Sequence, residues 1–180
     1  HPTSCGSCAK RMGSLELDRL AADSAVFIDS SIFVYHFTGV SAQCRNLLER
    51  CERAELKGAT SVTVLAEVTH RLLMIEAVQS GAVRSGNVAS RLRTRPDVIR
   101  TLPRTREQVA RIPLMGIEVH DLTLRLLLAA SDLQRDHGLM TNDSIIAATA
   151  LEAGIHDLAS ADRDFERLQQ LNVYAPIDLP

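Results

Sequence analysis

The chain has 180 residues, 46% of them hydrophobic, which is the length of one domain with enough apolar material to bury its own core. With no Trp, two Tyr and four Phe, it lacks the aromatic side chains for a base-stacking platform. Its formal net charge of −2 argues against a module that simply coats nucleic acid.

The charge is unevenly distributed along the chain. Between Arg84 and Arg111 there are eight Arg against Asp97 and Glu107, a local formal charge of +6. The rest of the chain therefore carries −8, so that an acidic body accompanies a basic segment. The low net charge thus does not exclude a nucleic-acid enzyme.

The N-terminal region and the cysteines give no sign of a site. We predict that residues 1–20 are a tail, either flexible or added for expression, and that residues 21–180 form the folded domain. Cys5 and Cys8 have C-x-x-C spacing, but no second pair follows at the spacing of a zinc site. The other two cysteines share one apolar helix face and are predicted to be core residues: Cys44 and Cys51.

The chain carries no targeting signal that we recognise. No run of apolar residues approaches the length of about 18 that a membrane span needs. The first residues also lack the apolar centre of a signal peptide. We therefore expect no membrane association, and the cysteine usage favours a reduced, cytoplasmic protein.

The first half of the chain alternates short apolar runs with helical periodicity. Residues 25–29 form an apolar run that predicts a buried strand, and residues 59–62 predict a second one. The spacing of apolar residues predicts a helix over 41–56 with Ser41 as its N-cap, followed after the second strand by a long helix that ends before Gly81.

A different pattern occupies residues 82–113, which are rich in Arg, poor in large apolar groups and interrupted by prolines. We expect two or three short helices there, which together form a protruding arm.

The second half of the chain returns to alternation. Residues 115–120 predict a third strand, and a helix capped by Asp121 and ended by Gly138 follows it. Another helix is predicted over 142–153, closed by Gly154. Three further elements complete the chain: a strand over residues 157–160, a helix over 164–171 and a strand over 172–175.

This alternation predicts a doubly wound α/β/α sandwich around a central, mainly parallel sheet, from which the helical arm protrudes. In such sheets, ligands bind outside the carboxyl ends of the strands. The residues predicted at that edge are therefore the candidates for a functional site.

Several acidic residues fall at this edge. Asp29 directly follows the first strand, and Asp162 and Asp164 follow a later one. Asp143 opens a helix, and Glu67 lies in the first turn of the long helix. Because like charges brought together repel unless a cation neutralises them, and because hard divalent ions prefer carboxylate oxygens, the pattern favours a Mg²⁺ or Mn²⁺ site.

Each of these acids also has a purely structural interpretation. Asp29 fits a turn at a strand end, and Glu67 fits a surface ion pair with Arg71, four residues further along the helix. The remaining acids fit helix-start or capping positions. Their joint occurrence where such folds bind ligands favours the metal site.

Four short segments carry these acids: VFIDSSI from Val26, SVTVLAEV from Ser61, TNDSIIAA from Thr141 and ASADRDF from Ala159. In this order and spacing they resemble the PIN-domain nucleases, particularly the VapC-type toxins of toxin–antitoxin pairs. The resemblance extends from about residue 25 to the end of the chain.

The resemblance implies a PIN-like fold and a metal-dependent endoribonuclease that uses Mg²⁺ or Mn²⁺, acting as the toxin of a type II toxin–antitoxin pair. It implies an RNA substrate, a protein antitoxin and a homodimer. The residues that it implies are the catalytic and metal-binding acids Asp29, Glu67, Asp143 and Asp162, the less constant metal ligand Asp164, and the supporting hydroxyl residues Ser31 and Ser160. No role is implied for Asn142.

With an RNA substrate, the Arg-rich arm is suited to phosphate contacts beside the acidic pocket. The candidate contact residues are Arg84, Arg91, Arg93, Arg95, Arg104 and Arg106. A solvated helical face and an antitoxin-binding surface are the alternatives for the same segment.

Three other functions remain open at this point. One is a PIN-like module that binds RNA or protein without catalysis, and another is an RNA-processing nuclease outside a toxin–antitoxin pair. The third is an aspartyl-phosphate protein, which is disfavoured because no second acid follows Asp29 and because Lys57 is the only lysine after the tail.

Overall fold

The computed structural model describes residues 13–180. One sheet of six strands, paired in parallel throughout, forms its centre in the order β1-β6-β5-β2-β3-β4. The strands are β1 (Leu15–Glu16), β2 (Ala25–Ile28), β3 (Lys57–Ser61), β4 (Ile117–His120), β5 (Asp157–Ala159) and β6 (Asn172–Ala175). The predicted α/β architecture with a parallel sheet is confirmed.

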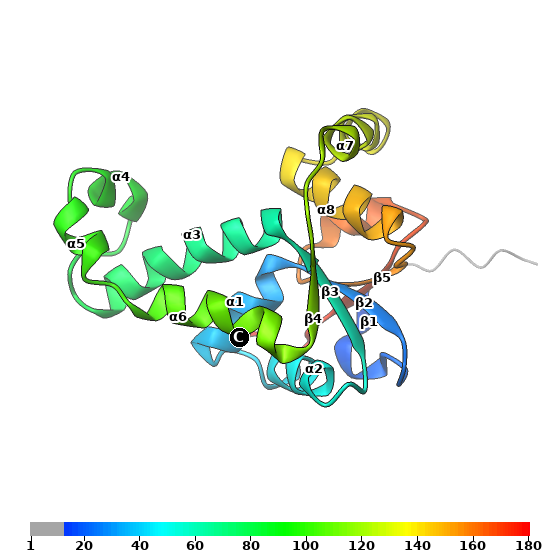
Figure 1. Cartoon of the computed structure of the whole chain (residues 1–180), viewed down its shortest axis with the longest axis horizontal. Coiled ribbons are helices and arrows are strands. Elements are labelled where there is room, and N and C mark those ends of the chain that lie inside the picture. Colours follow the sequence, from blue (N-terminus) through cyan, green and yellow to red (C-terminus); the bar gives the residue numbers. More distant parts are fainter. Residues whose placement is uncertain (1–12) are drawn as a thin grey trace, which may run out of the picture.

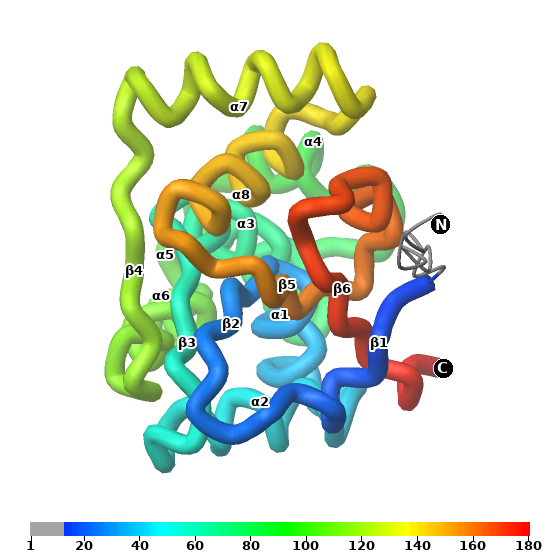
Figure 2. The backbone as a smooth tube through the Cα atoms, turned by 90° about the vertical axis from the view of Figure 1, so that its right-hand side faces the viewer, coloured from blue at the N-terminus to red at the C-terminus, as the bar shows by residue number. Residues whose placement is uncertain are grey.

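Helices connect the strands and cover both faces of the sheet (Figures 1 and 2). The α-helices are α1 (Ser30–Thr38), α2 (Ala42–Glu52), α3 (Val62–Gln79), α4 (Val88–Arg93), α5 (Pro96–Arg100), α6 (Arg104–Arg111), α7 (Leu124–His137) and α8 (Thr141–Glu152). The short 3₁₀ helices are η1 (Leu17–Arg19), η2 (Ile112–Met115) and η3 (Arg163–Arg167). None of the described helices is long and apolar enough to cross a membrane.

The strand order explains which helices lie together. From β2 the chain moves outward through β3 to β4, and it then returns past β2 to β5 and β6. Because parallel crossovers are right-handed, the helices of the outward path and those of the return path lie on opposite faces of the sheet. The carboxyl end of β2, where the direction changes, is thus the expected ligand-binding edge.

The core forms where the central strands are buried on both faces. Val26, Phe27 and Ile28 of β2 are fully buried, which explains why this strand is a continuous apolar run. Gly58 of β3 lets helix α2 approach closely, because a Cβ atom there would lie 2.9 Å from Sγ of Cys51. Cys51 and its predicted core partner Cys44 are both buried, and burial raises the pKa of each thiol to about 11.

The arm consists of three short helices, α4, α5 and α6, as its composition predicts. It packs along the C-terminal half of α3 through a small apolar cluster centred on Ala77, Val83, Leu92 and Val98. Figure 1 shows α4 and α5 at the far end of α3, away from the sheet.

A single carboxylate anchors the arm to α3. Glu76 is buried and accepts hydrogen bonds from the backbone N–H groups of Arg104 and Thr105, at 3.0 and 2.8 Å, and from the Thr105 hydroxyl at 2.7 Å. It therefore caps α6, whose own N-cap residue Pro103 offers no side-chain acceptor. Burial opposes ionisation, but these donors outweigh it and hold the pKa of Glu76 below its usual value.

The predicted tail boundary at residue 20 is wrong. Leu15 and Glu16 form β1, which pairs with Tyr174 and Ala175 of β6. Leu17 and Leu20 are buried in the main core, so residues 15–20 belong to the domain. Their apolar side chains are too few to show periodicity, which is why the sequence pattern missed them. The first 12 residues, including the Cys5–Cys8 pair, lie outside the described part.

Two helix predictions also need correction, and one helix of the structure was missed. The predicted helix over 164–171 is the 3₁₀ helix η3, because Phe165 and Leu168, three residues apart, are the side chains that enter the core. The N-cap of α7 is Thr123 and not Asp121, since its hydroxyl accepts from the N–H of Leu126. Helix α1 was not predicted at all.

Candidate active site

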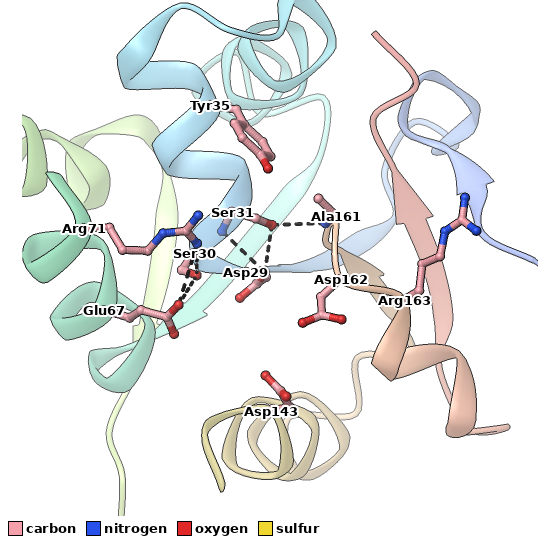
Figure 3. A pocket seen from close by; sticks show the side chains of 10 residues that line it. All are labelled: Asp29, Ser30, Ser31, Tyr35, Glu67, Arg71, Asp143, Ala161, Asp162 and Arg163. Carbon is pink, nitrogen blue, oxygen red and sulfur yellow. Dashed lines mark hydrogen bonds and ion pairs between the residues drawn. The ribbon is translucent and has the colours of Figure 1, made fainter. Parts of the chain in front are cut away.

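A pocket of about 310 Å³ lies at the carboxyl ends of β2 and β5 (Figure 3). Four carboxylates, two guanidinium groups and several smaller groups form its wall. The lining residues are Asp29, Ser30, Ser31, Tyr35, Glu67, Arg71, Asp143, Ala161, Asp162 and Arg163. The four principal acids predicted from the sequence thus meet in one pocket.

Asp29 lies at the base of the pocket, directly after β2, and is only 5% exposed. Its Oδ2 atom accepts hydrogen bonds from the hydroxyl groups of Ser31 and Ser160, each at 2.8 Å. The two hydroxyls in turn accept from the backbone N–H groups of Ala161 and Asp162. Asp29 is therefore fixed in orientation by a network that joins the ends of β2 and β5.

Glu67 enters the pocket from α3, one turn later in the helix than predicted, because α3 begins at Val62 directly after β3. Its Oε1 atom accepts from the Ser30 hydroxyl at 2.9 Å and lies 3.7 Å from Nη1 of Arg71. The ion pair suggested as a structural alternative for Glu67 thus exists inside the pocket itself.

Asp143 projects into the pocket from the first turn of α8, opposite Asp29 and Asp162 (Figure 3). Burial raises the pKa of Asp143 to about 6, together with repulsion from four other carboxylates, of which Asp162 and Asp29 contribute most. This carboxylate is therefore the one whose ionisation the pocket opposes, and a bound cation would relieve that repulsion.

Asp162 and Asp164 are separated by the structure. Asp162 lines the pocket and caps η3, because its Oδ1 atom accepts from the N–H of Asp164 at 2.8 Å. The side chain of Asp164 lies outside the lining and pairs with Arg167 at 2.9 Å. The structure thus brings four of the five predicted acids together and directs the fifth to a surface ion pair.

The donor set fits a hard divalent cation. Carboxylate oxygens are the ligands that Mg²⁺ and Mn²⁺ prefer, and the pocket wall has four carboxylates against two guanidinium groups. Within residues 13–180, no three carboxylate, imidazole or thiol groups lie close enough to hold one ion as they stand. Binding of a cation therefore requires the side chains to converge.

The predicted RNA-contact arginines lie elsewhere, since none of the six lines the pocket. Glu67 is near the start of α3, and the arm packs around Ala77, ten residues and about 15 Å further along the helix axis at 1.5 Å per residue. Three of the six make local contacts: Arg91 donates to the carbonyl groups of Arg84 and Ser85, Arg95 pairs with Asp97, and Arg104 pairs with Glu76.

Sequence reasoning missed five of the residues that line the pocket, among them Ala161, which contributes its backbone N–H to the hydrogen bond with Ser31. Ser30 and Tyr35 belong to α1, the helix that it did not predict. Arg71 and Arg163 were visible in the sequence as neighbours of Glu67 and Asp162 but were not considered as pocket residues. The available signal was their spacing, because Arg71 is one helical turn after Glu67.

A comparison of the sequence with family models matches residues 26–171 to the PIN domain. Two curated relatives are similar over most of both chains, and both are from Methanocaldococcus jannaschii. Ribonuclease VapC2 is 23% identical over 152 residues, which cover 84% of this chain and 93% of the relative. Ribonuclease VapC6 is 26% identical over 151 residues, which cover 83% of this chain and 96% of the relative.

Solved structures share the fold at low sequence identity. VapBC2 from Rickettsia felis, bound to a DNA fragment from the promoter, aligns with a TM-score of 0.56 and 18% identity, covering 84% of this chain and 98% of that one. A toxin–antitoxin complex from Klebsiella pneumoniae aligns with a TM-score of 0.51 and 18% identity, over 81% and 94% of the two chains. VapC20 from Mycobacterium tuberculosis, a sarcin–ricin loop cleaving toxin, aligns with a TM-score of 0.52 and 19% identity, over 78% and 92%.

Proposed function

Since this chain belongs to the PIN-domain family, we propose that it is a divalent-metal-dependent endoribonuclease that hydrolyses RNA phosphodiester bonds. The observation that carries the proposal is the meeting of four carboxylates, from four separate segments, in one pocket at the carboxyl edge of the sheet. Two relatives that align over most of their length are ribonucleases by name, which supports the choice of RNA.

We assign the metal ion, Mg²⁺ or Mn²⁺, to Asp29, Glu67, Asp143 and Asp162. When bound, it would supply positive charge for the phosphoryl oxygens and activate the attacking water. Ser31 and Ser160 orient Asp29 through the hydrogen bonds to its Oδ2 atom, so they act as supporting residues. Asp164 is left out of this ligand set because its carboxylate pairs with Arg167.

Asp143 has a separate part in this scheme. With a pKa of about 6, it carries a proton in about half of the metal-free molecules at pH 6 and in about one tenth at pH 7. Because a carboxylic acid must lose this proton before it binds a cation, metal affinity rises with pH through this range. Its position at the N-terminus of α8 places the charge near the positive end of the helix dipole.

The same proposal includes a protein antitoxin, a homodimer and a cytoplasmic location, as in a type II toxin–antitoxin pair. The antitoxin is supported by the fold neighbours, two of which are toxin–antitoxin complexes by their descriptions. Light scattering tests the dimer, and cell fractionation tests the location. Rescue of growth by the product of an adjacent gene tests the antitoxin, whereas its failure favours an RNA-processing nuclease outside such a pair.

Cleavage of single-stranded RNA by the purified protein is the direct test of the nuclease. We expect cleavage with Mg²⁺ or Mn²⁺, none after removal of the metal by a chelator, and none with Asp143→Asn. Asp132→Asn is the matched control, because Asp132 is an exposed acid that pairs with Arg135 and lies outside the pocket. Metal-dependent RNA binding without cleavage would instead identify a non-catalytic module.

A further inference from the structure

Arg71 occupies an unusual place for a basic residue, because it lies on the wall of an acidic pocket in contact with one of the acids. Its Nη1 atom is 3.7 Å from Oε1 of Glu67 and 3.3 Å from the Ser30 hydroxyl. The Ser30 hydroxyl donates to the same Oε1 atom at 2.9 Å. One oxygen of Glu67 is thus held by two groups, as Figure 3 shows.

This contact occupies one of the two carboxylate oxygens through which Glu67 could bind a metal ion. Glu67 is the acid assigned to the metal from α3, yet its Oε1 atom is turned to Ser30 and Arg71. In the described part of the chain, no three potential ligands are close enough to hold one ion. Release of Glu67 from Arg71 is one of the movements that would bring the ligands together.

The ion pair is weak enough to exchange. The side chains of Arg71 and Glu67 are 34% and 29% exposed, so solvent screens their attraction. Pairs of this kind stabilise by a small factor, about twofold to fivefold in an equilibrium constant. A phosphate group that accepted two parallel charged hydrogen bonds from Arg71 would be a better partner than Glu67, which offers it one oxygen at 3.7 Å.

The pocket also needs a cation to admit a phosphate. Its four carboxylates and two guanidinium groups leave a formal charge of −2. Of the two arginines, Arg163 is directed away from the carboxylates in Figure 3, whereas Arg71 points toward them. Arg71 is therefore the positive group positioned to meet a phosphate beside the acids.

We infer that Arg71 is an exchangeable counter-ion: it holds Glu67 in the metal-free pocket and transfers to a phosphate group of the bound RNA, which frees Glu67 to bind the metal ion. This inference rests on the proposed function and adds a positioning residue to it. It requires metal binding and phosphate binding to strengthen each other, by the same factor in either order.

Calorimetric titration with Mn²⁺ tests the inference without any bond being cut. The probe for the phosphate is adenosine 5′-monophosphate, and the Mn²⁺ that the nucleotide binds by itself is measured separately and subtracted. The parent protein should bind Mn²⁺ more tightly when the nucleotide is present. Arg71→Gln should bind Mn²⁺ alone about threefold more tightly than the parent, because the competitor for Glu67 is gone. It should also lose most of the effect of the nucleotide.

Arg163→Gln is the matched control, since it removes the same charge from the same pocket without removing a contact to Glu67. It should keep the coupling between nucleotide and metal. In a Glu67→Gln background, Arg71→Gln should no longer raise the affinity for Mn²⁺. Thermal melting of each variant establishes that it is folded before the titration.

Two results would overturn the inference: equal effects of Arg71→Gln and Arg163→Gln, which indicate a general charge effect, or unchanged coupling in Arg71→Gln. Either result, in a protein that cleaves RNA, leaves the proposed function intact. Coupling that depends on Arg71 in a protein that never cleaves RNA would support the inference and contradict the nuclease.

Discussion

The acids of the pocket repel one another, whereas the acid at the base of the arm is surrounded by donors. Asp143 has a pKa raised to about 6 by burial and by neighbouring carboxylates. Glu76 is more deeply buried than Asp143, but three hydrogen-bond donors of the arm hold its pKa below the usual value. The proximity of the acids in the pocket thus lowers the stability of the fold, whereas Glu76 of α3 stabilises the arm.

The arginines of the pocket and of the arm also differ in their contacts. Arg71 contacts Glu67 in the pocket. A metal ion that bound Glu67 would replace Arg71 as the partner of this carboxylate. In the arm, the guanidinium group of Arg91 donates to two backbone carbonyl groups and Arg104 pairs with Glu76, so these side chains hold local structure. The density of arginines along the sequence therefore does not show what each arginine does. Its role depends on the group that its side chain contacts in the structure.

The largest effect that we predict is on the rate of RNA cleavage by a pocket variant, Asp143→Asn, whose thermal stability should not fall. Asp143→Asn should lower the rate of RNA cleavage at least about 100-fold, because a charged group that acts on the transition state is lost. The same substitution removes repulsion, so the metal-free variant should melt at the same temperature as the parent or higher. Cleavage assays and thermal melts of the same preparations measure both quantities. A variant with reduced melting temperature would indicate a structural role for Asp143.

For Glu76, the acid of α3 that anchors the arm, we expect a loss of stability. Glu76→Ala should lower the free energy of unfolding by about 2 kcal/mol, because the N–H groups of Arg104 and Thr105 lose their acceptor at the start of α6. Glu76→Gln should lower it less, since the amide oxygen still accepts. Urea unfolding measures the change. Equal stability of Glu76→Ala and the parent would contradict the anchoring role.

Asp143 and Glu76 should also affect the pH dependence of folding stability in opposite directions. The folded-state pKa of Asp143 lies above the value of 3.8 expected in the unfolded chain, so the folded state binds more protons and its stability falls as pH rises from about 4 to about 6. Glu76, whose pKa is lowered, contributes stability that is present above about 4.5 and is lost as pH falls through its folded value.

Melting curves of the metal-free protein between pH 3 and 8 separate these contributions. The melting-temperature difference between Asp143→Asn and the parent should grow from near zero at about pH 4 to a plateau above about pH 7. The difference between Glu76→Gln and the parent should instead shrink at the acid end. A constant difference across this range for Asp143→Asn would show that its ionisation is not opposed by the pocket.

The smallest effects are expected from the exposed arginines of the arm. Arg93→Gln and Arg106→Gln should each weaken RNA binding only about threefold and reduce the slope of log affinity against log salt by about 1, if each contacts one phosphate. The cleavage rate at saturating RNA should stay the same. Binding titrations at several salt concentrations measure the slope. Unchanged affinity and slope would leave the arm as a solvated or partner-binding surface.

The parts of the fold that sequence reasoning predicted correctly have strong local patterns. The run of Val26, Phe27 and Ile28 is buried on both faces of the sheet, which makes it a strand that any pattern analysis finds. Helix α3 has regular apolar spacing, and it ends at Gln79, two residues before Gly81, whose left-handed backbone cannot continue a helix. Asp29, Asp143 and Asp162 were found because they directly follow or open such elements.

The parts that were missed depend on contacts distant in sequence. Helix α1 is buried over Ser30, Ser31, Ile32, Phe33 and Val34 in succession, so it lacks the polar face that identifies a surface helix. Strand β1 has two residues and exists because β6, near the other end of the chain, pairs with it. The roles of Arg71 and Asp164 could not be inferred from the sequence, because each depends on the ion pair that the side chain forms in the folded structure, with Glu67 and Arg167 respectively.

The strand order has a consequence for how the protein is made. The pocket needs Asp29 and Arg163, which are separated by most of the chain, and β1 has no partner until β6 exists. The carboxylate of Asp178 completes the capping of α2, because it accepts from the N–H groups of Ala42 and Gln43. A growing chain on the ribosome therefore cannot form the complete pocket before Arg163 has been synthesised. The site therefore arises late in synthesis, after both halves of the sheet that supply its side chains have been made.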